Sequence, residues 1–188
     1  SIGLGGRLLS DLSNAIIVSM GTGTAFIKAD DKGVRHLGGS GVGGGTLLGL
    51  SHTMLNVSNF NDLIETAQGG SLAHVDLTIG DISRDVLTGL PPDTTASNFG
   101  KLSDLASKAD LAVGIINLVF QTIGLLAVFA ARVDQTKDIV LTGNLVNVPQ
   151  APNIFAQLSQ LFGVNFIIPP NAEFATAAGA AVSFLEGV

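Results

Sequence analysis

Two glycine-rich turns, separated by a short predicted hairpin, constrain this chain more than any other feature of its sequence. The first turn, residues 21–24, directly follows an apolar, β-branched run at 15–19 that is typical of a buried strand. The second turn, residues 38–45, contains six glycines in eight positions. Each glycine costs backbone entropy on folding, so this run indicates a backbone that must bend sharply or admit a ligand.

Turns of this kind suit a phosphate group, because successive free amides form a concavity that binds anions. A helix expected from Thr46 would add its N-terminal amides, and Thr22, Thr24 and Ser40 add hydroxyls. Neither turn ends in the Lys-Ser/Thr pair of a Walker A loop. The alternative is that both are only tight turns, since hairpins use glycine anyway. The entropic cost of the glycine run favours a site that holds phosphoryl groups by backbone donors.

Strand-like and helix-like segments alternate along the chain, which predicts an α/β fold in one domain. We expect strands at residues 15–19, 25–28, 34–37, 138–142 and 165–168, and helices at 46–55, 60–68, 101–107, 110–133, 154–162 and 173–185.

Composition excludes several classes of function. The chain has 188 residues, of which 46% are hydrophobic and 13% charged, so it fits an ordered domain. Its formal charge is -6 and its 9 basic residues are scattered, which leaves no stripe for nucleic acid. His36, His52 and His74 lack metal-ligand spacing and there is no cysteine, so no metal site is expected.

An uncharged stretch at residues 111–131 is long enough to span a bilayer. Asn117, Gln121 and Thr122 interrupt it and no aromatic belt flanks it, so we expect a buried core helix, partly covered by a second subunit, and no membrane. Asn117 and Gln121 share a helical face, where they would bond across that interface or to each other. Residues 1–9 do not have the pattern of a signal peptide. Asp76 and Asp81 are expected to be solvated carboxylates.

Several stretches resemble, in order, the type II pantothenate kinases. The main ones are Val-Ser-Met-Gly-Thr-Gly-Thr at 18–24 and His-Leu-Gly-Gly-Ser-Gly-Val-Gly-Gly-Gly-Thr-Leu-Leu-Gly-Leu at 36–50. Gly-Asp-Ile at 80–82, Thr-Ala-Ser-Asn-Phe-Gly at 95–100, Ile-Val-Leu-Thr-Gly-Asn at 139–144 and the small-residue helix near 174–181 follow. Together they span nearly the whole chain, which makes them more specific than either turn alone.

The resemblance implies an actin/hexokinase-type fold, with residues 1–188 forming a single C-terminal lobe: a ribonuclease-H-like mixed sheet flanked by helices. It implies ATP-dependent, Mg²⁺-dependent phosphorylation of pantothenate in a cytoplasmic homodimer that pairs through the 110–133 helix. It also implies contacts to ATP from Gly21, Thr22, Gly23, Thr24, Gly43, Gly44, Gly45, Thr46, Gly143 and Asn144, and contacts to the substrate from Arg35, His36, Gly39 and Ser40.

Two departures from the family pattern qualify these expectations. The first phosphate loop, whose Asp works with Mg²⁺, and the catalytic Glu belong to an N-terminal lobe that is absent here, so no catalytic base is assigned in this chain. The arginine before the long glycine turn aligns with His36, and Arg35 precedes it; a strand points the two side chains to opposite faces. Another small-molecule kinase or ATPase of this fold, or a non-catalytic dimerising pseudokinase module, remains an alternative.

Overall fold

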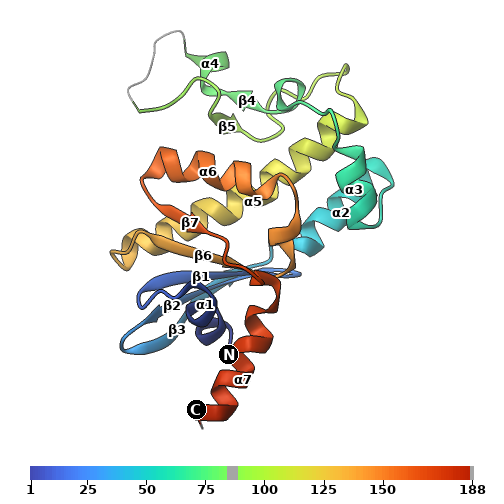
Figure 1. The fold of residues 1–188 in the computed structure, drawn as a ribbon. Helices are drawn as coiled ribbons and strands as arrows, with labels where there is room; N and C mark the ends of the chain where they lie inside the picture. The colour runs from blue at the N-terminus through green and yellow to red at the C-terminus, as the bar shows by residue number, and fades with distance from the viewer. Residues whose placement is uncertain (84–88, 187–188) are drawn as a thin grey trace. The chain divides into compact units, whose positions relative to one another are not determined.

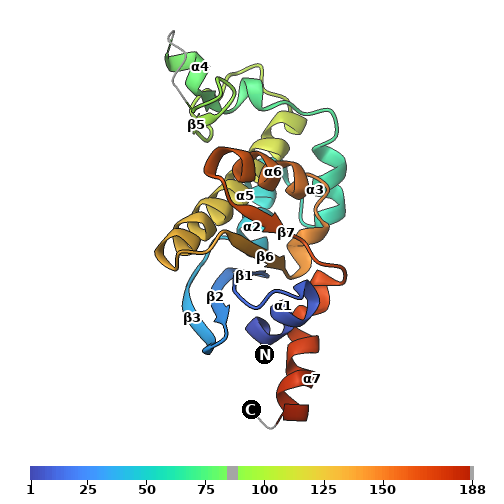
Figure 2. The ribbon, with the colours of Figure 1, turned by 60° about the vertical axis from the view of Figure 1, so that its left-hand side comes forward.

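The computed structural model describes residues 1–83 and 89–186 (Figures 1 and 2). The chain divides into two compact units, one formed by Ser1–Thr46 and Phe120–Val188 and the other by Leu47–Val119. Two helices, α2 (Gly44–Leu55) and α5 (Lys108–Val133), begin in one unit and end in the other.

The first unit is built on a five-stranded mixed sheet in the order β3-β2-β1-β6-β7. The central strand β1 pairs antiparallel with β2, which pairs antiparallel with β3, whereas β1, β6 and β7 run parallel. The predicted α/β fold with a mixed sheet flanked by helices is confirmed. The strand bounds are β1 (Ala15–Met20), β2 (Thr24–Asp30), β3 (Gly33–Ser40), β6 (Asp138–Thr142) and β7 (Asn165–Ile167).

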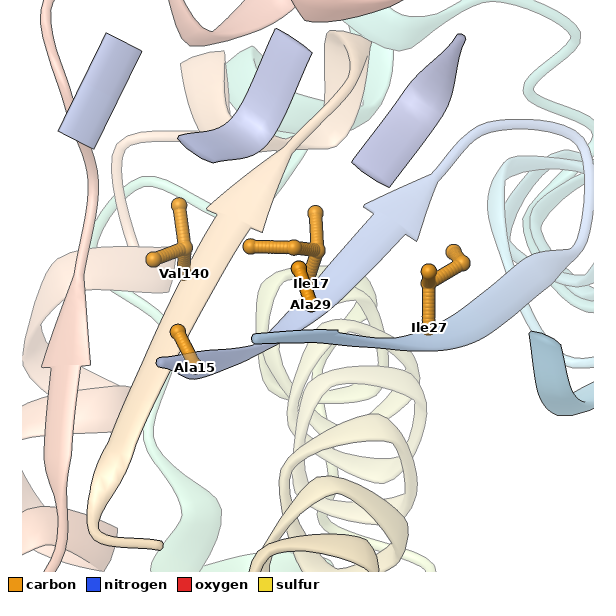
Figure 3. Packing of buried hydrophobic residues seen from close by; sticks show 5 residues of the cluster. All are labelled: Ala15, Ile17, Ile27, Ala29 and Val140. Carbon is orange, nitrogen blue, oxygen red and sulfur yellow. The ribbon is translucent and has the colours of Figure 1, made fainter. Parts of the chain in front are cut away.

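Helices cover both faces of this sheet. On one face, α1 (Ile2–Ser10) lies against the strands and α7 (Ala175–Glu186) packs against α1, and the apolar side chains of β1, β2 and β6 point to one side (Figure 3). On the other face lie the end of α5 and α6 (Ala151–Phe162), whose Phe120 and Phe155 rings meet edge to face with centroids 5.7 Å apart. Two short 3-10 turns, η2 (Asn144–Asn147) and η3 (Ala172–Phe174), complete this unit.

Helix α1 has no counterpart among the sequence-based predictions. Glycines at three of its nine positions lower its intrinsic helix propensity, so its stability depends on distant partners. Backbone contact with α7 supplies them: a Cβ at Gly5 would lie 1.7 Å from the Ala175 carbonyl oxygen, and one at Gly179 1.8 Å from that of Ser1. The two helices pack this closely because neither has a side chain at the crossing point.

Two predicted elements differ from the structure. Residues 38–40, expected in the glycine turn, are the last residues of β3, because they pair in register with β2. The prediction of a helix at 101–107 was wrong, since this segment forms turns. The Lys101 amide donates to the Val75 carbonyl and the Ser103 amide to that of His74, so their amides bond to a distant segment.

The second unit contains the remaining short elements. Its strands β4 (Leu77–Thr78) and β5 (Thr95–Ser97) form an antiparallel pair, and the N-terminal half of α5 lies in the same unit. Helix α5 is long and apolar enough to cross a bilayer by length and composition, and 61% of its most apolar window is buried. The other elements are α3 (Phe60–Thr66), η1 (Leu72–His74) and α4 (Ile79–Ile82).

Candidate phosphate-binding site

The two glycine turns lie directly against each other at the end of β1. The Gly44 amide donates to the Gly21 carbonyl at 2.8 Å, and the Gly45 amide donates to the Thr22 carbonyl at 2.9 Å. Helix α2 begins at Gly44, so the first amides of this helix are used to join the turns. The amides of Gly44 and Gly45 are therefore bonded within the protein, and the predicted contacts of these two residues to ATP stay a prediction.

Close approach between the turns explains part of the glycine run. A Cβ at Gly43 would lie 2.7 Å from the Thr22 carbonyl oxygen, and one at Gly23 would lie 2.8 Å from that of Ser40. Both neighbours are backbone atoms, which cannot rotate away. These glycines are required by packing between main chains, whether or not a ligand is bound.

Three hydroxyls expected at the site fix the shape of the second turn. Thr24 Oγ1 donates to the Val42 carbonyl at 2.8 Å, and Ser40 Oγ accepts from the Val42 amide at 3.0 Å. Thr46 Oγ1 donates to the Gly41 carbonyl at 3.0 Å and accepts from the Gly43 amide at 3.2 Å. The turn is consequently held in one conformation by its own side chains.

A hollow of about 480 Å³ opens where the turns meet. Among the described residues, the amides of Thr22, Gly23 and Gly41 donate no hydrogen bond to the protein, and Gly23 and Gly41 line the hollow. No lining residue is charged. An anion bound here would be held by backbone dipoles, which is how glycine turns bind phosphate. The lining consists of Ser19, Gly21, Gly23, Thr24, Ala25, Gly39, Ser40 and Gly41.

The predicted site residues other than Arg35 and His36 fall into three groups. Gly21, Gly23, Thr24, Gly39 and Ser40 line the hollow. Thr22, Gly43, Gly44, Gly45 and Thr46 form the turns around it, with the bonds and contacts given above. Gly143 lies against the strand that leads into the first turn, since a Cβ there would be 2.5 Å from the Met20 carbonyl oxygen, and the exposed Asn144 follows it.

Arg35 and His36 lie further back along β3. Extended strands rise about 3.4 Å per residue, so Arg35 is about 17 Å from Ser40 along the chain. Its guanidinium bonds to Asp134 Oδ1 at 2.9 Å. The described lining of the hollow includes neither residue, and their predicted contact with a substrate stays a prediction.

Sequence reasoning missed three lining residues. Gly41 was inside the recognised glycine run but was not selected, although its position beside Ser40 was a usable signal. Ser19 and Ala25 flank the first turn on strands, and they line the hollow because they sit directly opposite each other across β1 and β2. That register depends on the hairpin geometry, which the sequence pattern indicated only coarsely.

The lining residues that the structure describes provide no carboxylate for a magnesium ion. Mg²⁺ is usually held by one or two carboxylates together with substrate phosphates, whereas this hollow offers hydroxyls and backbone groups. Nowhere in residues 1–83 and 89–186 do three or more acidic, histidine or cysteine side chains gather as a metal site would need. The described residues of this chain do not by themselves fit Mg²⁺.

A second hollow, of about 800 Å³, lies along α6 and β7. Apolar side chains such as Phe155, Phe166 and Ile168 line much of it, and Lys137 is its one charged lining residue among those described. It contains none of the predicted site residues. The smaller hollow therefore remains the candidate site.

In the second unit, Asp76 is wholly buried rather than solvated, which corrects the expectation for this residue. Its carboxylate accepts from Asn117 Nδ2 at 2.7 Å, Asn98 Nδ2 at 3.2 Å and the Phe99 amide at 2.9 Å. Asn117 is itself 2% exposed, and its side-chain amide nitrogen donates to this carboxylate, whereas the predicted bond across a subunit interface or to Gln121 stays a prediction. The cluster joins α5 to the 95–100 segment.

Two other carboxylates of the second unit have lowered pKa values. Lys101 Nζ lies 2.6 Å from Asp81 and, with the Thr78 backbone amide, lowers the pKa of Asp81 to about 2. The Ser107 and Ser71 backbone amides hold the pKa of Asp110 well below its usual range. Both carboxylates are committed to structural bonds at neutral pH.

Comparison with known proteins identifies the family. Residues 10–163 match the family described as Fumble. The chain belongs to the Fumble family. A type II pantothenate kinase of Bacillus cereus is 32% identical over 154 residues, which cover 80% of this chain and 56% of that protein. One of Staphylococcus epidermidis is 32% identical over 140 residues, covering 72% and 53%. The predicted resemblance is confirmed, and this Fumble chain spans about half the length of those relatives.

Solved structures agree on the fold. The activator of the 2-hydroxyisocaproyl-CoA dehydratase from Clostridium difficile, with bound ADPNP, superposes with a TM-score of 0.63 at 16% identity. That superposition covers 99% of this chain and 65% of the activator. The ethanolamine utilization protein EutJ from Carboxydothermus hydrogenoformans gives 0.57 at 11% identity, covering 97% and 53%. The actin/hexokinase-like fold predicted for the Fumble chain is thereby confirmed.

Proposed function

We propose that the protein containing this chain phosphorylates pantothenate with ATP, the first step of coenzyme A biosynthesis, and that residues 1–188 form its C-terminal, nucleotide-binding lobe. The observation that carries the proposal is the hollow between the two joined glycine turns, with the unbonded amides of Gly23 and Gly41 in its lining. Membership of the Fumble family and the similarity to type II pantothenate kinases support the choice of substrate.

The arrangement suits phosphoryl transfer, which depends mostly on positioning and on stabilising charge spread over the phosphoryl oxygens. Fixed backbone dipoles stabilise such charge without reorganising during the reaction. Thr24, Ser40 and Thr46 hold the turn in place beforehand. Asn144 and Gly143, beyond the end of β6, are the residues we propose for the adenosine side of the nucleotide.

We propose that a base for the pantothenate hydroxyl and a carboxylate for Mg²⁺ come from another part of the protein, since the described lining of the hollow contains no carboxylate. The 188-residue chain alone is therefore expected to bind ATP weakly and to phosphorylate no pantothenate. We further propose a cytoplasmic location, as the resemblance implies.

A homodimer through α5 is also proposed. Leu126, Phe129 and Val133 are spaced by three and four residues, so they form one stripe on the helix. Their exposed fractions are 38%, 54% and 82%, which is high for large apolar side chains. Phe129→Asp is expected to convert the dimer to a monomer in sedimentation velocity without loss of helical circular dichroism. A dimer that survives this substitution would place the interface elsewhere.

The function is tested by narrowing the hollow. A Cβ at Gly41 would meet no atom within 4 Å, so Gly41→Ala should fold normally while placing a methyl group beside the proposed phosphate. The dissociation constant for ATP should rise about tenfold, the cost of weakening one hydrogen bond to a charged group. Gly49→Ala, also in open space but on α2, is the matched control and should bind ATP as the unsubstituted protein does.

The substrate is tested with the full-length gene product. Phosphorylation of pantothenate, and of no sugar at a comparable rate, supports the proposal. Phosphorylation of another alcohol, or ATP hydrolysis without an acceptor, favours a different kinase or ATPase of this fold. Unchanged ATP affinity in Gly41→Ala would refute the hollow as the phosphate site, whereas an absence of ATP binding altogether would point to a non-catalytic dimerising module.

A further inference from the structure

We propose that Ser19 is a positioning residue that hydrogen-bonds the acceptor alcohol, the molecule that receives the phosphoryl group. The inference rests on the proposed function and adds a residue to it. The Ser19 side chain is half-buried in β1 and lines the hollow. Among the described residues its hydroxyl has no hydrogen-bond partner, so a donor and an acceptor are available to a ligand.

Strand alternation places Ser19 on the face of the sheet that α1 covers further back. Two residues earlier, Ile17 lies under that helix, since a Cβ at Gly6 would be 2.5 Å from Ile17 Cγ2. Side chains two residues apart on a strand share a face. Ile17 and its neighbours point to one side of the sheet in Figure 3. By the alternation of side chains, Ser19 lies on that side too, two residues closer to the first glycine turn.

Three small residues form a floor next to the turns. Ser19 pairs with Ala25 on β2, and Ala25 pairs with Gly39 on β3, so the three lie in one row across adjacent strands. All three line the hollow. Because their side chains are small, a ligand can lie close to the sheet along this row, and Ser19 supplies its only side-chain hydroxyl.

Comparison with Thr142, the neighbour of Ser19 on β6, shows that an unbonded hydroxyl is specific to the position of Ser19. Thr142 on β6 pairs with Ser19 but is 1% exposed, and its Oγ1 donates to the Val18 carbonyl at 3.2 Å. The hydroxyls of these two paired residues therefore differ: that of Thr142 is buried and bonded within the protein, and that of Ser19 is open to the hollow.

The strand order indicates which ligand Ser19 meets. The proposed adenosine residues follow β6, which lies on one side of β1, whereas the floor extends to β2 and β3 on the other side. A nucleotide with its phosphates at the turns and its adenosine toward Gly143 leaves the floor vacant. The acceptor alcohol is then the molecule that lies over Ala25 and Gly39 and reaches Ser19.

In the reaction, the acceptor oxygen forms a bond to the γ-phosphorus of ATP as the bond from that phosphorus to the ADP oxygen breaks. The hydroxyl proton of the acceptor passes to a base outside this chain. Ser19 forms no covalent bond in this step. Its hydroxyl fixes the orientation of the acceptor, so its loss should weaken acceptor binding and leave ATP binding unchanged.

The test compares Ser19→Ala and the nearly isosteric Ser19→Cys in the full-length protein. Loss of one neutral hydrogen bond should raise the KM for pantothenate about three- to tenfold. The KM for ATP and the dissociation constant for ATP should stay within about twofold, on the same basis. Ser183→Ala removes the same hydroxyl from α7, outside the hollow, and should change neither KM.

Each outcome decides the proposal. A rise confined to pantothenate supports it, and a KM for pantothenate unchanged in both variants refutes it. A rise confined to ATP would assign Ser19 to the nucleotide and also refute it. If the unsubstituted protein binds ATP but phosphorylates no pantothenate, the proposed function fails, and the role of Ser19 toward this acceptor fails with it.

Discussion

The buried bond between Asn117 and Asp76 gives a quantitative prediction for Asn117→Ala. This substitution removes a 2.7 Å hydrogen bond to a carboxylate oxygen in a site where Asp76 is 0% and Asn117 2% exposed. Bonds to charged groups contribute about 1.5–3 kcal/mol, and the cavity left by the amide adds to that cost. The Phe99 amide and Asn98 still satisfy Asp76 in part. We expect the free energy of unfolding to fall by about 3 kcal/mol.

Asn98→Ala is the matched control, because Asn98 donates to the same oxygen, Asp76 Oδ2, but is only half-buried. Water can replace its amide, so the substitution should cost less than about 1 kcal/mol. Circular dichroism at 222 nm during urea unfolding is the suitable assay, since the chain has no Trp or Tyr. Hydrogen exchange at the Phe99 amide reports the cluster locally. Equal costs for the two variants would refute the role assigned to burial.

Two further predictions concern packing and pH. Gly5→Ala would place a Cβ 1.7 Å from the Ala175 carbonyl oxygen and should destabilise the chain by at least about 3 kcal/mol in thermal melts. In the same assay, Gly49→Ala, which meets open space on α2, should stabilise the chain by about 0.5–1 kcal/mol. Because the pKa of Asp110 is lowered in the folded state, its carboxylate stabilises the fold above the pKa of about 4 that an unfolded aspartate has. This stabilisation is progressively lost as the pH falls below that value. The stability difference between unsubstituted protein and Asp110→Asn, from urea unfolding at pH 7 and pH 3, should therefore shrink at pH 3; a constant difference would contradict this.

The local sequence pattern was sufficient to predict the strands around the site. The apolar run after residue 14 and the Asp138–Thr142 strand are each followed by a glycine. Each lies in the centre of the sheet, where burial on both faces favours apolar residues throughout a strand. The position of the turns between β1, β2 and α2 followed from the same reasoning. The glycines themselves were recognised, although their packing against one another was not.

Features set by distant contacts were missed. Helix α1 exists because Gly5 and Gly179 meet across 174 positions of the sequence, which no local pattern reveals. Asp76 looked like a surface acid, and only the approach of Asn117, 41 residues away, makes its burial possible. Ser19 was overlooked because its place in the lining depends on the register between β1 and β2.

The candidate site is made almost wholly of main-chain atoms, and this has a consequence for inhibitor design. A compound that accepts hydrogen bonds from the amides of Gly23 and Gly41 would contact groups that every amino acid except proline possesses. Resistance normally arises when a bulkier side chain displaces a drug, yet at Gly23 or Gly43 such a side chain would collide with the opposite turn. Mutations that exclude the compound there would also damage the protein that acquires them.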